Sequence, residues 1–236
     1  MSKKQALTEF HRGSILAAAE RLFTEKGTEK TTMDDIAREA EYSKATLYVY
    51  FQSKEEIINA ILLSGLVLLR KKLHEAIESP AGWLERYDAV CRVIVRFYDE
   101  NPTAYDAATG VMPLPGASEE VQKGQADIIR VAGEIDQEMA AFLVSGTEEG
   151  VVRSKLPPME TVMLFWAALS GIIHMAEFRE EFLKKTLGVT REEYLSHGAR
   201  LLLDALSGDS QKGGLGRPLV GPNRFSFFRG CPLRTY

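Results

Sequence analysis

Residues 31–54 constrain the fold more than any other part of the chain, because they contain two strong helix starts a short distance apart. Thr32 is followed by two aspartates, as is typical of an N-cap and the first turn of a helix. Ser43 is a good N-cap for a second short helix over residues 44–50. Two short helices joined by a sharp turn predict a helix-turn-helix, whose second helix enters the major groove of DNA.

The second of these helices is expected to carry an unusual outward face. Leu47 and Phe51 are four residues apart and should point into the core. The residues then left to face outward are Lys44, Ala45, Thr46, Tyr48 and Tyr50. Hydroxyl and ammonium groups bond phosphate oxygens readily, and a small alanine can approach a thymine methyl. A solvated helix pair within a larger domain is the alternative, and exposed tyrosines beside a lysine favour a DNA-binding surface.

At these residues the chain resembles the TetR family of one-component bacterial transcription regulators. The resemblance covers roughly residues 10–58, and its motifs are Thr31-Thr32, Asp34-Asp35-Ile36-Ala37 and the run from Ser43 to Glu55. An upstream helix that ends at Gly27 also fits the family, with an apolar face of Ile15, Ala18, Ala19, Leu22 and Phe23.

The resemblance implies a set of DNA contacts. The residues that it places on phosphates are Lys44, Tyr48, Tyr50, Lys54 and, at the start of the first motif helix, Thr32. Ala45 and Thr46 are implied to lie nearest the bases. Ala45 and Tyr50 stand where the family often has glycine and histidine, respectively, and both residues are compatible with a recognition helix.

The charge of the chain limits how it can bind DNA. The net charge is −4, which argues against a general nucleic-acid coat, because such proteins are strongly basic. Residues 44–54 contain only two lysines. The affinity for DNA should therefore come from two copies acting together, so we expect a homodimer on a double-stranded operator.

Several other classes of protein are disfavoured. No nucleophile elbow, Gly-rich phosphate loop or HExxH motif is present, so we expect no enzyme, no metal and no cofactor. Two distant cysteines, Cys91 and Cys231, fit a reducing cytoplasm, and Cys91 is expected to be an inert buried thiol. The N-terminus lacks the apolar segment of a signal peptide. The most apolar runs, 57–69 and 162–173, are shorter than the ~18 residues of a membrane span, so we expect no membrane partner.

Almost every segment has helical periodicity, and we predict an all-α fold. After the upstream helix, the first expected helix starts near residue 33. The others span residues 44–50, 54–77, 81–99, about 101–110, 118–144, 158–178 and 191–206. We expect three parts: a helix-turn-helix domain (1–53), a ligand-binding and dimerisation domain (54–208) and a flexible basic tail (209–236). For the tail, a DNA-binding arm, a packed segment and a translated cloning remnant stay open.

The family resemblance implies that two late helices pair with those of a second copy, and these would be residues 158–178 and 191–206. The first of these has small residues among bulky ones, which permits close helix packing: Ala167, Ala168, Ser170 and Gly171. The central helix of a monomeric bundle is the alternative.

The resemblance also implies a small-molecule pocket in the second domain. An aromatic or imidazole body with a polar atom suits an internal ligand site, which singles out Tyr105, Trp166 and His174. Further wall candidates are Tyr87, Met112 and Phe142. An unidentified apolar or aromatic effector is expected to release a repressor from its operator. The alternative is an architectural or division-linked DNA-binding dimer without an effector. The sequence leaves open the effector, the operator and whether the protein represses or activates.

Overall fold

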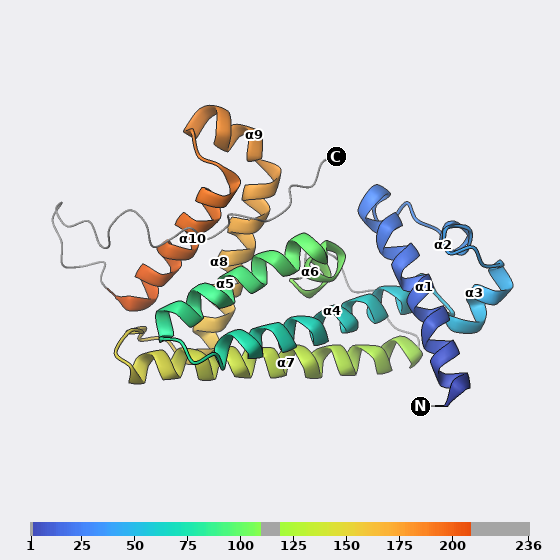
Figure 1. Ribbon diagram of the computed structural model, residues 1–236, viewed down its shortest axis with the longest axis horizontal. Coiled ribbons are helices and arrows are strands. Elements are labelled where there is room, and N and C mark those ends of the chain that lie inside the picture. The colour runs from blue at the N-terminus through green and yellow to red at the C-terminus, as the bar shows by residue number, and fades with distance from the viewer. Residues whose placement is uncertain (1, 110–118, 209–236) are drawn as a thin grey trace. The chain divides into compact units, whose positions relative to one another are not determined.

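The computed structural model describes residues 2–109 and 119–208, and these residues form helices and connecting loops without a strand (Figure 1). The predicted all-α fold is confirmed. Met112 and the tail at 209–236 lie outside the described residues. Packing divides the chain into two units. The described residues of unit 1 fall within Met1–Leu69 and Tyr98–Gly133, and those of unit 2 fall within Arg70–Phe97 and Glu134–Tyr236. The division that we predicted at residues 53 and 208 stays a prediction.

Unit 1 begins with helix α1, Lys3–Lys26. A capping box starts it: the Ser2 side chain accepts from the Gln5 backbone N–H, and the Gln5 side chain accepts from that of Ser2. The helix ends at Gly27, whose φ of 82° suits a residue without a Cβ. Its apolar face is buried as predicted, except that Leu22 is half-buried.

Two short helices follow, α2 (Met33–Glu39) and α3 (Lys44–Tyr50), with the starts that the caps predicted. The turn between them contains Glu41 at a φ of 60°, a left-handed conformation that makes the turn sharp. Leu47 of α3 and Phe51, the residue after its end, are both 0% exposed and anchor the helix in the core.

The rest of unit 1 comes from longer helices. Helix α4 spans Lys54–Ile77, α5 spans Trp83–Glu100 and α7 spans Glu119–Glu148, and each of the three contributes residues to both units. The short helix α6, Pro102–Ala108, lies in unit 1, where it contacts α1. Helix α7 extends four residues beyond the predicted end at 144.

An aromatic stack forms part of the core of unit 2. The Trp83 ring lies 4.8 Å from that of Phe142, nearly parallel to it, and 5.6 Å from that of Tyr87. The indole Nε1 donates a 2.9 Å hydrogen bond to the carbonyl of Phe142. Gly146 lies against the same indole so closely that a Cβ would stand 2.4 Å from a Trp83 carbon. A glycine is therefore required here for close packing. Cys91 is also buried, and burial raises the pKa of its thiol to about 12, which favours the less reactive protonated form.

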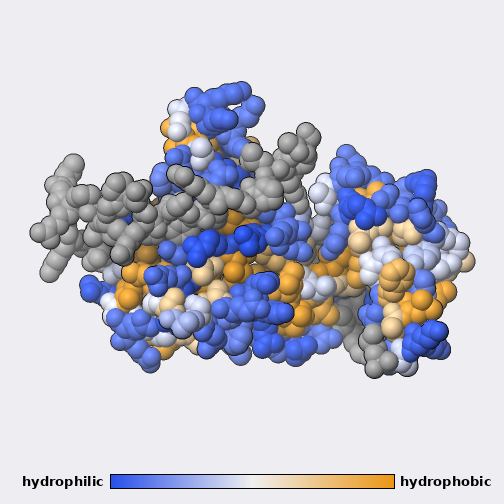
Figure 2. All heavy atoms as spheres, in the orientation of Figure 1, coloured by the Kyte–Doolittle hydropathy of each residue, from blue (hydrophilic) through white to orange (hydrophobic). Residues whose placement is uncertain are grey.

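Helices α8 (Pro158–Phe178) and α10 (Arg191–Ser207) pack against each other in unit 2. Between them lie two elements that the sequence patterns did not reveal, the single turn α9 (Glu180–Phe182) and the π-helix η1 (Leu183–Leu187). Figure 2 shows hydrophobic residues among hydrophilic ones near α9, where Phe178 and Phe182 are 77% and 50% exposed.

Helix α8 has the bounds that we predicted, and its apolar stretch is longer than the run at 162–173. An 18-residue window within it has a mean hydropathy of 1.4, so that by length and composition alone it could cross a membrane. Core helices of soluble proteins pass the same test, and the criterion is therefore weak evidence for a membrane partner.

Candidate nucleic-acid interface

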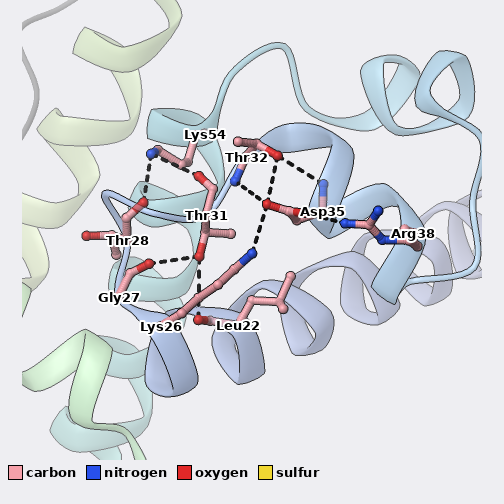
Figure 3. Close-up of polar contacts among 9 residues, drawn as sticks. All are labelled: Leu22, Lys26, Gly27, Thr28, Thr31, Thr32, Asp35, Arg38 and Lys54. Carbon is pink, nitrogen blue, oxygen red and sulfur yellow. Dashed lines mark hydrogen bonds and ion pairs between the residues drawn. The ribbon is translucent and has the colours of Figure 1, made fainter.

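The start of α2 is fixed by the carboxylate of Asp35 (Figure 3). One carboxylate oxygen accepts from the Thr32 N–H at 3.1 Å, the Thr32 hydroxyl at 2.8 Å and the Lys26 ammonium at 2.8 Å. The other oxygen accepts from Arg38. The Lys26 ammonium, with help from the Thr32 backbone, lowers the pKa of Asp35 far below its ordinary value. The ionised carboxylate therefore holds the N-cap, α1 and α2 together.

The loop before α2 is held from the other side by Lys54, the first residue of α4. Its ammonium donates to the backbone carbonyls of Thr28 at 2.7 Å and Thr31 at 3.1 Å (Figure 3). Thr31, which precedes the cap residue Thr32, is buried and donates its hydroxyl to the Gly27 carbonyl at 2.8 Å. In this structure Lys54 thus binds the protein's own backbone, and its contact with a phosphate stays a prediction.

Helix α3 presents part of the face that we predicted. Lys44, Ala45 and Tyr48 are exposed, whereas Thr46 is half-buried and its hydroxyl lies 2.7 Å from that of Ser43. The exposed set also includes Val49, which is 74% exposed and which the sequence argument did not single out. Their roles at DNA stay predictions.

Tyr50 does not project freely. It is half-buried, and its ring lies 5.5 Å from that of His11. The His11 Nδ1 in turn lies 2.6 Å from the hydroxyl of Tyr42 in the turn between α2 and α3. The sequence argument expected Tyr50 to point outward, and packing against α1 explains the difference.

Arg12 holds the end of α3, and sequence reasoning missed it. Its guanidinium donates a 2.7 Å hydrogen bond to the Tyr50 carbonyl and lies 4.1 Å from the centre of the Phe51 ring. It also lies 3.8 Å from a carboxylate oxygen of Glu56 in the first turn of α4. A cation at a helix C-terminus is a favourable arrangement, but no local pattern links residues 38 positions apart.

One ion pair crosses from α2 to α3 at the exposed face. The Lys44 ammonium lies 2.7 Å from a carboxylate oxygen of Asp34, and both side chains are more than half exposed. This hydrogen bond and the attraction of the carboxylate raise the pKa of Lys44. Lys44, the one cation of α3, thus stays protonated and is paired with Asp34 of α2.

Two of the candidate ligand residues share a cavity in the described part of unit 2. Tyr87 and Phe142 line an apolar cavity of about 10 Å³, together with Val90, Met139, Leu143, Val162 and Phe165. That space is at most the size of one water molecule. The hydroxyl of Tyr87 is used within the core, because it donates to the Ala199 carbonyl at 2.8 Å.

The other candidates have their polar atoms engaged or lie elsewhere. Tyr105 belongs to unit 1, is 1% exposed and packs edge-on against Tyr98. The Trp166 Nε1 donates to Asp136 at 3.1 Å, and the His174 Nδ1 donates to the Ser170 carbonyl of its own helix at 2.8 Å. Within the described part of the chain no three His, Cys, Asp or Glu side chains gather in a way that could hold a metal ion.

The chain is similar to known regulators of transcription. Residues 15–61 match the family model described as bacterial regulatory proteins, tetR family. The uncharacterised HTH-type transcriptional regulator YhgD of Bacillus subtilis is 25% identical over 146 residues, which cover 62% of this chain and 72% of that protein. Two further curated relatives are matched over only 34% and 38% of their length.

Solved structures share the fold. The TetR family transcriptional regulator PfmR of Thermus thermophilus is 26% identical with a TM-score of 0.59, over 86% of this chain and 99% of that one. The regulator FadR of Bacillus subtilis, solved in complex with stearoyl-CoA, is 16% identical with a TM-score of 0.62, over 83% and 97% of the two chains.

The lowered pKa of Asp35 predicts a specific pH dependence of stability. A carboxyl group whose pKa is depressed in the folded state stabilises it above the unfolded pKa of about 3.9, and this contribution is lost as the pH falls toward the folded value. Replacing Asp35 by Asn should therefore lower the free energy of unfolding at pH 7, and the difference from wild type should shrink below about pH 4.

Urea unfolding monitored by circular dichroism at several pH values measures this difference. Asp127→Asn is the control, because Asp127 is an exposed acid of α7 that pairs with Arg130 of the next turn. A difference between wild type and Asp35→Asn that persists unchanged at pH 3 would contradict the proposed role of the ionised carboxylate.

Proposed function

Because the chain belongs to the TetR family of bacterial transcriptional regulators, we propose that it is a cytoplasmic repressor that binds operator DNA as a dimer and is released by a small molecule. The observation that carries the DNA-binding part is the braced helix pair, whose second helix exposes Lys44, Ala45, Tyr48 and Val49. A short helix with such a face fits the major groove.

The proposed contacts divide by chemistry. Lys44, Tyr48 and the hydroxyl of Thr32 are suited to phosphate oxygens, which fix the position of a protein on DNA. Ala45 and Thr46 are suited to base edges, where a small or methyl-bearing side chain can meet a thymine methyl. Tyr50 and Lys54 already make contacts within unit 1, through the Tyr50 ring and the Lys54 ammonium, and a phosphate contact would add to these or replace them.

We propose that the dimer forms through α8 and α10. Bulky apolar residues remain exposed on α8, including Met163, Leu164 and Met175 at 46–54% exposure. On the same helix a Cβ added to Gly171 would meet open space, so another helix can approach closely there. On α10, Leu201 is 68% exposed. Such a combination on two packed helices favours a four-helix interface with a second copy.

For release, we propose a population shift carried by α4, which contributes residues to both units. Tight binding requires two recognition helices about 34 Å apart, so an effector that favours another spacing must weaken DNA binding. The stearoyl-CoA bound to FadR makes a fatty acyl-CoA thioester a reasonable effector class to test beside aromatic acids. The alternative is a DNA-binding dimer without an effector, and the cavity lined by Tyr87 and Phe142 is too small in this structure to hold an effector of either class.

The DNA-binding proposal predicts that Ala45→Glu loses duplex affinity, because it places a negative charge where bases and phosphates would approach. We expect at least a tenfold loss, measured by fluorescence anisotropy with a labelled duplex from upstream of the gene and with random duplex, across a salt series. Ala141→Glu, the same change at an exposed position of α7, is the matched control. Equal affinities of the two variants would contradict the placement of Ala45 at the DNA.

The interface proposal predicts that Leu164→Glu separates the dimer. Light scattering after gel filtration should change from twice 26.3 kDa toward 26.3 kDa, because a buried unpaired carboxylate opposes association. Leu84→Glu is a close control, since Leu84 on α5 is 49% exposed and Leu164 is 54% exposed. A dimer that survives Leu164→Glu, or a wild-type protein of monomer mass, would refute this interface.

The effector proposal predicts that stearoyl-CoA or an aromatic carboxylic acid such as benzoate raises the melting temperature and weakens duplex binding. A ligand at 100 times its Kd should stabilise the folded state by about 2.7 kcal/mol. Free coenzyme A and acetate are the controls that lack the apolar group. Stabilisation without any change in duplex affinity would argue against release, and no stabilisation by either class would favour the effector-free alternative.

A further inference from the structure

Asp34 and Lys44 form an ion pair within the surface that the proposed function assigns to DNA. The Lys44 ammonium lies 2.7 Å from the Asp34 carboxylate, and the two side chains are 60% and 61% exposed. Asp34 is in the first turn of α2, and Lys44 is the first residue of α3. Lys44 is also the one charged residue of α3, so Asp34 offsets the only side-chain charge on that helix.

Five other cations of the same region are already engaged within unit 1. Lys26 and Arg38 both contact Asp35, Arg21 contacts Glu39, and Lys54 contacts backbone carbonyls. Arg12 is held under the end of α3 by Tyr50, Phe51 and Glu56. Lys44 is the one cation on the exposed face of α3 that could bind a phosphate. In the free protein its ammonium is already paired with the Asp34 carboxylate.

Phosphate binding by a lysine is driven by the release of counterions condensed on DNA, and this needs a net positive charge. A lysine paired with a carboxylate releases less, and the carboxylate itself repels the phosphate. We propose that Asp34 limits the DNA affinity of this protein by competing with phosphate for the Lys44 ammonium. The inference rests on the proposed function, because it needs the helix pair to meet DNA.

The role of Asp34 can be tested without disturbing the start of α2. Asp34 is not the acid that caps α2, because that task falls to Asp35, whose carboxylate binds Thr32. Asp34 can therefore be neutralised while the capping box stays intact. The change removes only a favourable charge at a helix N-terminus, which is a small effect at an exposed site.

The test is Asp34→Asn, measured by fluorescence anisotropy on random duplex and on upstream duplex between 50 and 200 mM salt, concentrations at which phosphate contacts are sensitive to salt. An exposed ion pair corresponds to about a two- to fivefold change in Kd for each recognition helix, or about 0.4–1 kcal/mol at 1.4 kcal/mol per tenfold. A dimer should show about the square of that factor. The slope of log affinity against log salt should steepen by about 0.9 for each helix.

Two further variants isolate the ion pair. Glu25→Gln removes one negative charge from an exposed position of α1 and reports the general effect of charge. In a Lys44→Gln background, Asp34→Asn should improve binding no more than Glu25→Gln does, because the competition needs the ammonium. Thermal unfolding of each variant checks that α2 remains folded.

Tighter binding and a steeper salt slope for Asp34→Asn, abolished by Lys44→Gln, are the expected results. If the wild-type protein binds DNA and Asp34→Asn binds no more tightly than Glu25→Gln, this inference alone is overturned. If Asp34→Asn binds more weakly than the wild type, the inference is also wrong, because Asp34 then orients Lys44 instead of competing for it. If the wild-type protein bound neither duplex at 50 mM salt, the proposed function itself would fail and this inference with it.

Discussion

The contact on which the helix pair depends is the carboxylate of Asp35. It joins Lys26 of α1, the cap residue Thr32 and Arg38 of α2, so one side chain fixes where α2 begins and how it meets α1. The position of α3 follows from α2, because only a tight turn with Glu41 in the left-handed region separates them. Leu47 and Phe51 then hold α3 against the core, and Arg12 closes its end.

Several basic side chains of this arrangement are paired with groups of the protein itself. Lys54 binds two carbonyls, Arg12 binds a carbonyl and lies over an aromatic ring, and Lys44 is paired with Asp34. A net charge of −4 points the same way. Unit 1 therefore offers neutral hydroxyl and methyl groups in a fixed geometry more than it offers charge. Such a surface favours selectivity over strong general attraction to DNA.

Local signals predicted the fold well, and contacts between distant residues were not accessible to them. Thr32 and Ser43 are N-caps whose partners lie three residues away, so the starts of α2 and α3 could be read from the sequence. Apolar periodicity likewise predicted α4 and α8.

The brace from Arg12 to Tyr50 and the clamp from Lys54 to Thr28 join residues 38 and 26 positions apart, and no periodic pattern encodes them. The π-helix η1 was missed because its spacing follows neither the helical nor the strand period. For the ligand site, the sequence supplied suitable side chains, and of these Tyr87 and Phe142 line one small cavity in the described part of unit 2.

The aromatic stack around Trp83 gives the protein a spectroscopic property. The chain has two tryptophans, Trp83 and Trp166, and both belong to unit 2, whereas the helix pair has none. Trp83 is buried between two aromatic rings, and Trp166 is half-buried with its indole N–H on a carboxylate. Intrinsic tryptophan fluorescence therefore reports on unit 2 alone. Any change in that signal when a duplex meets unit 1 would be an optical record of coupling between the units, obtained without attaching a dye.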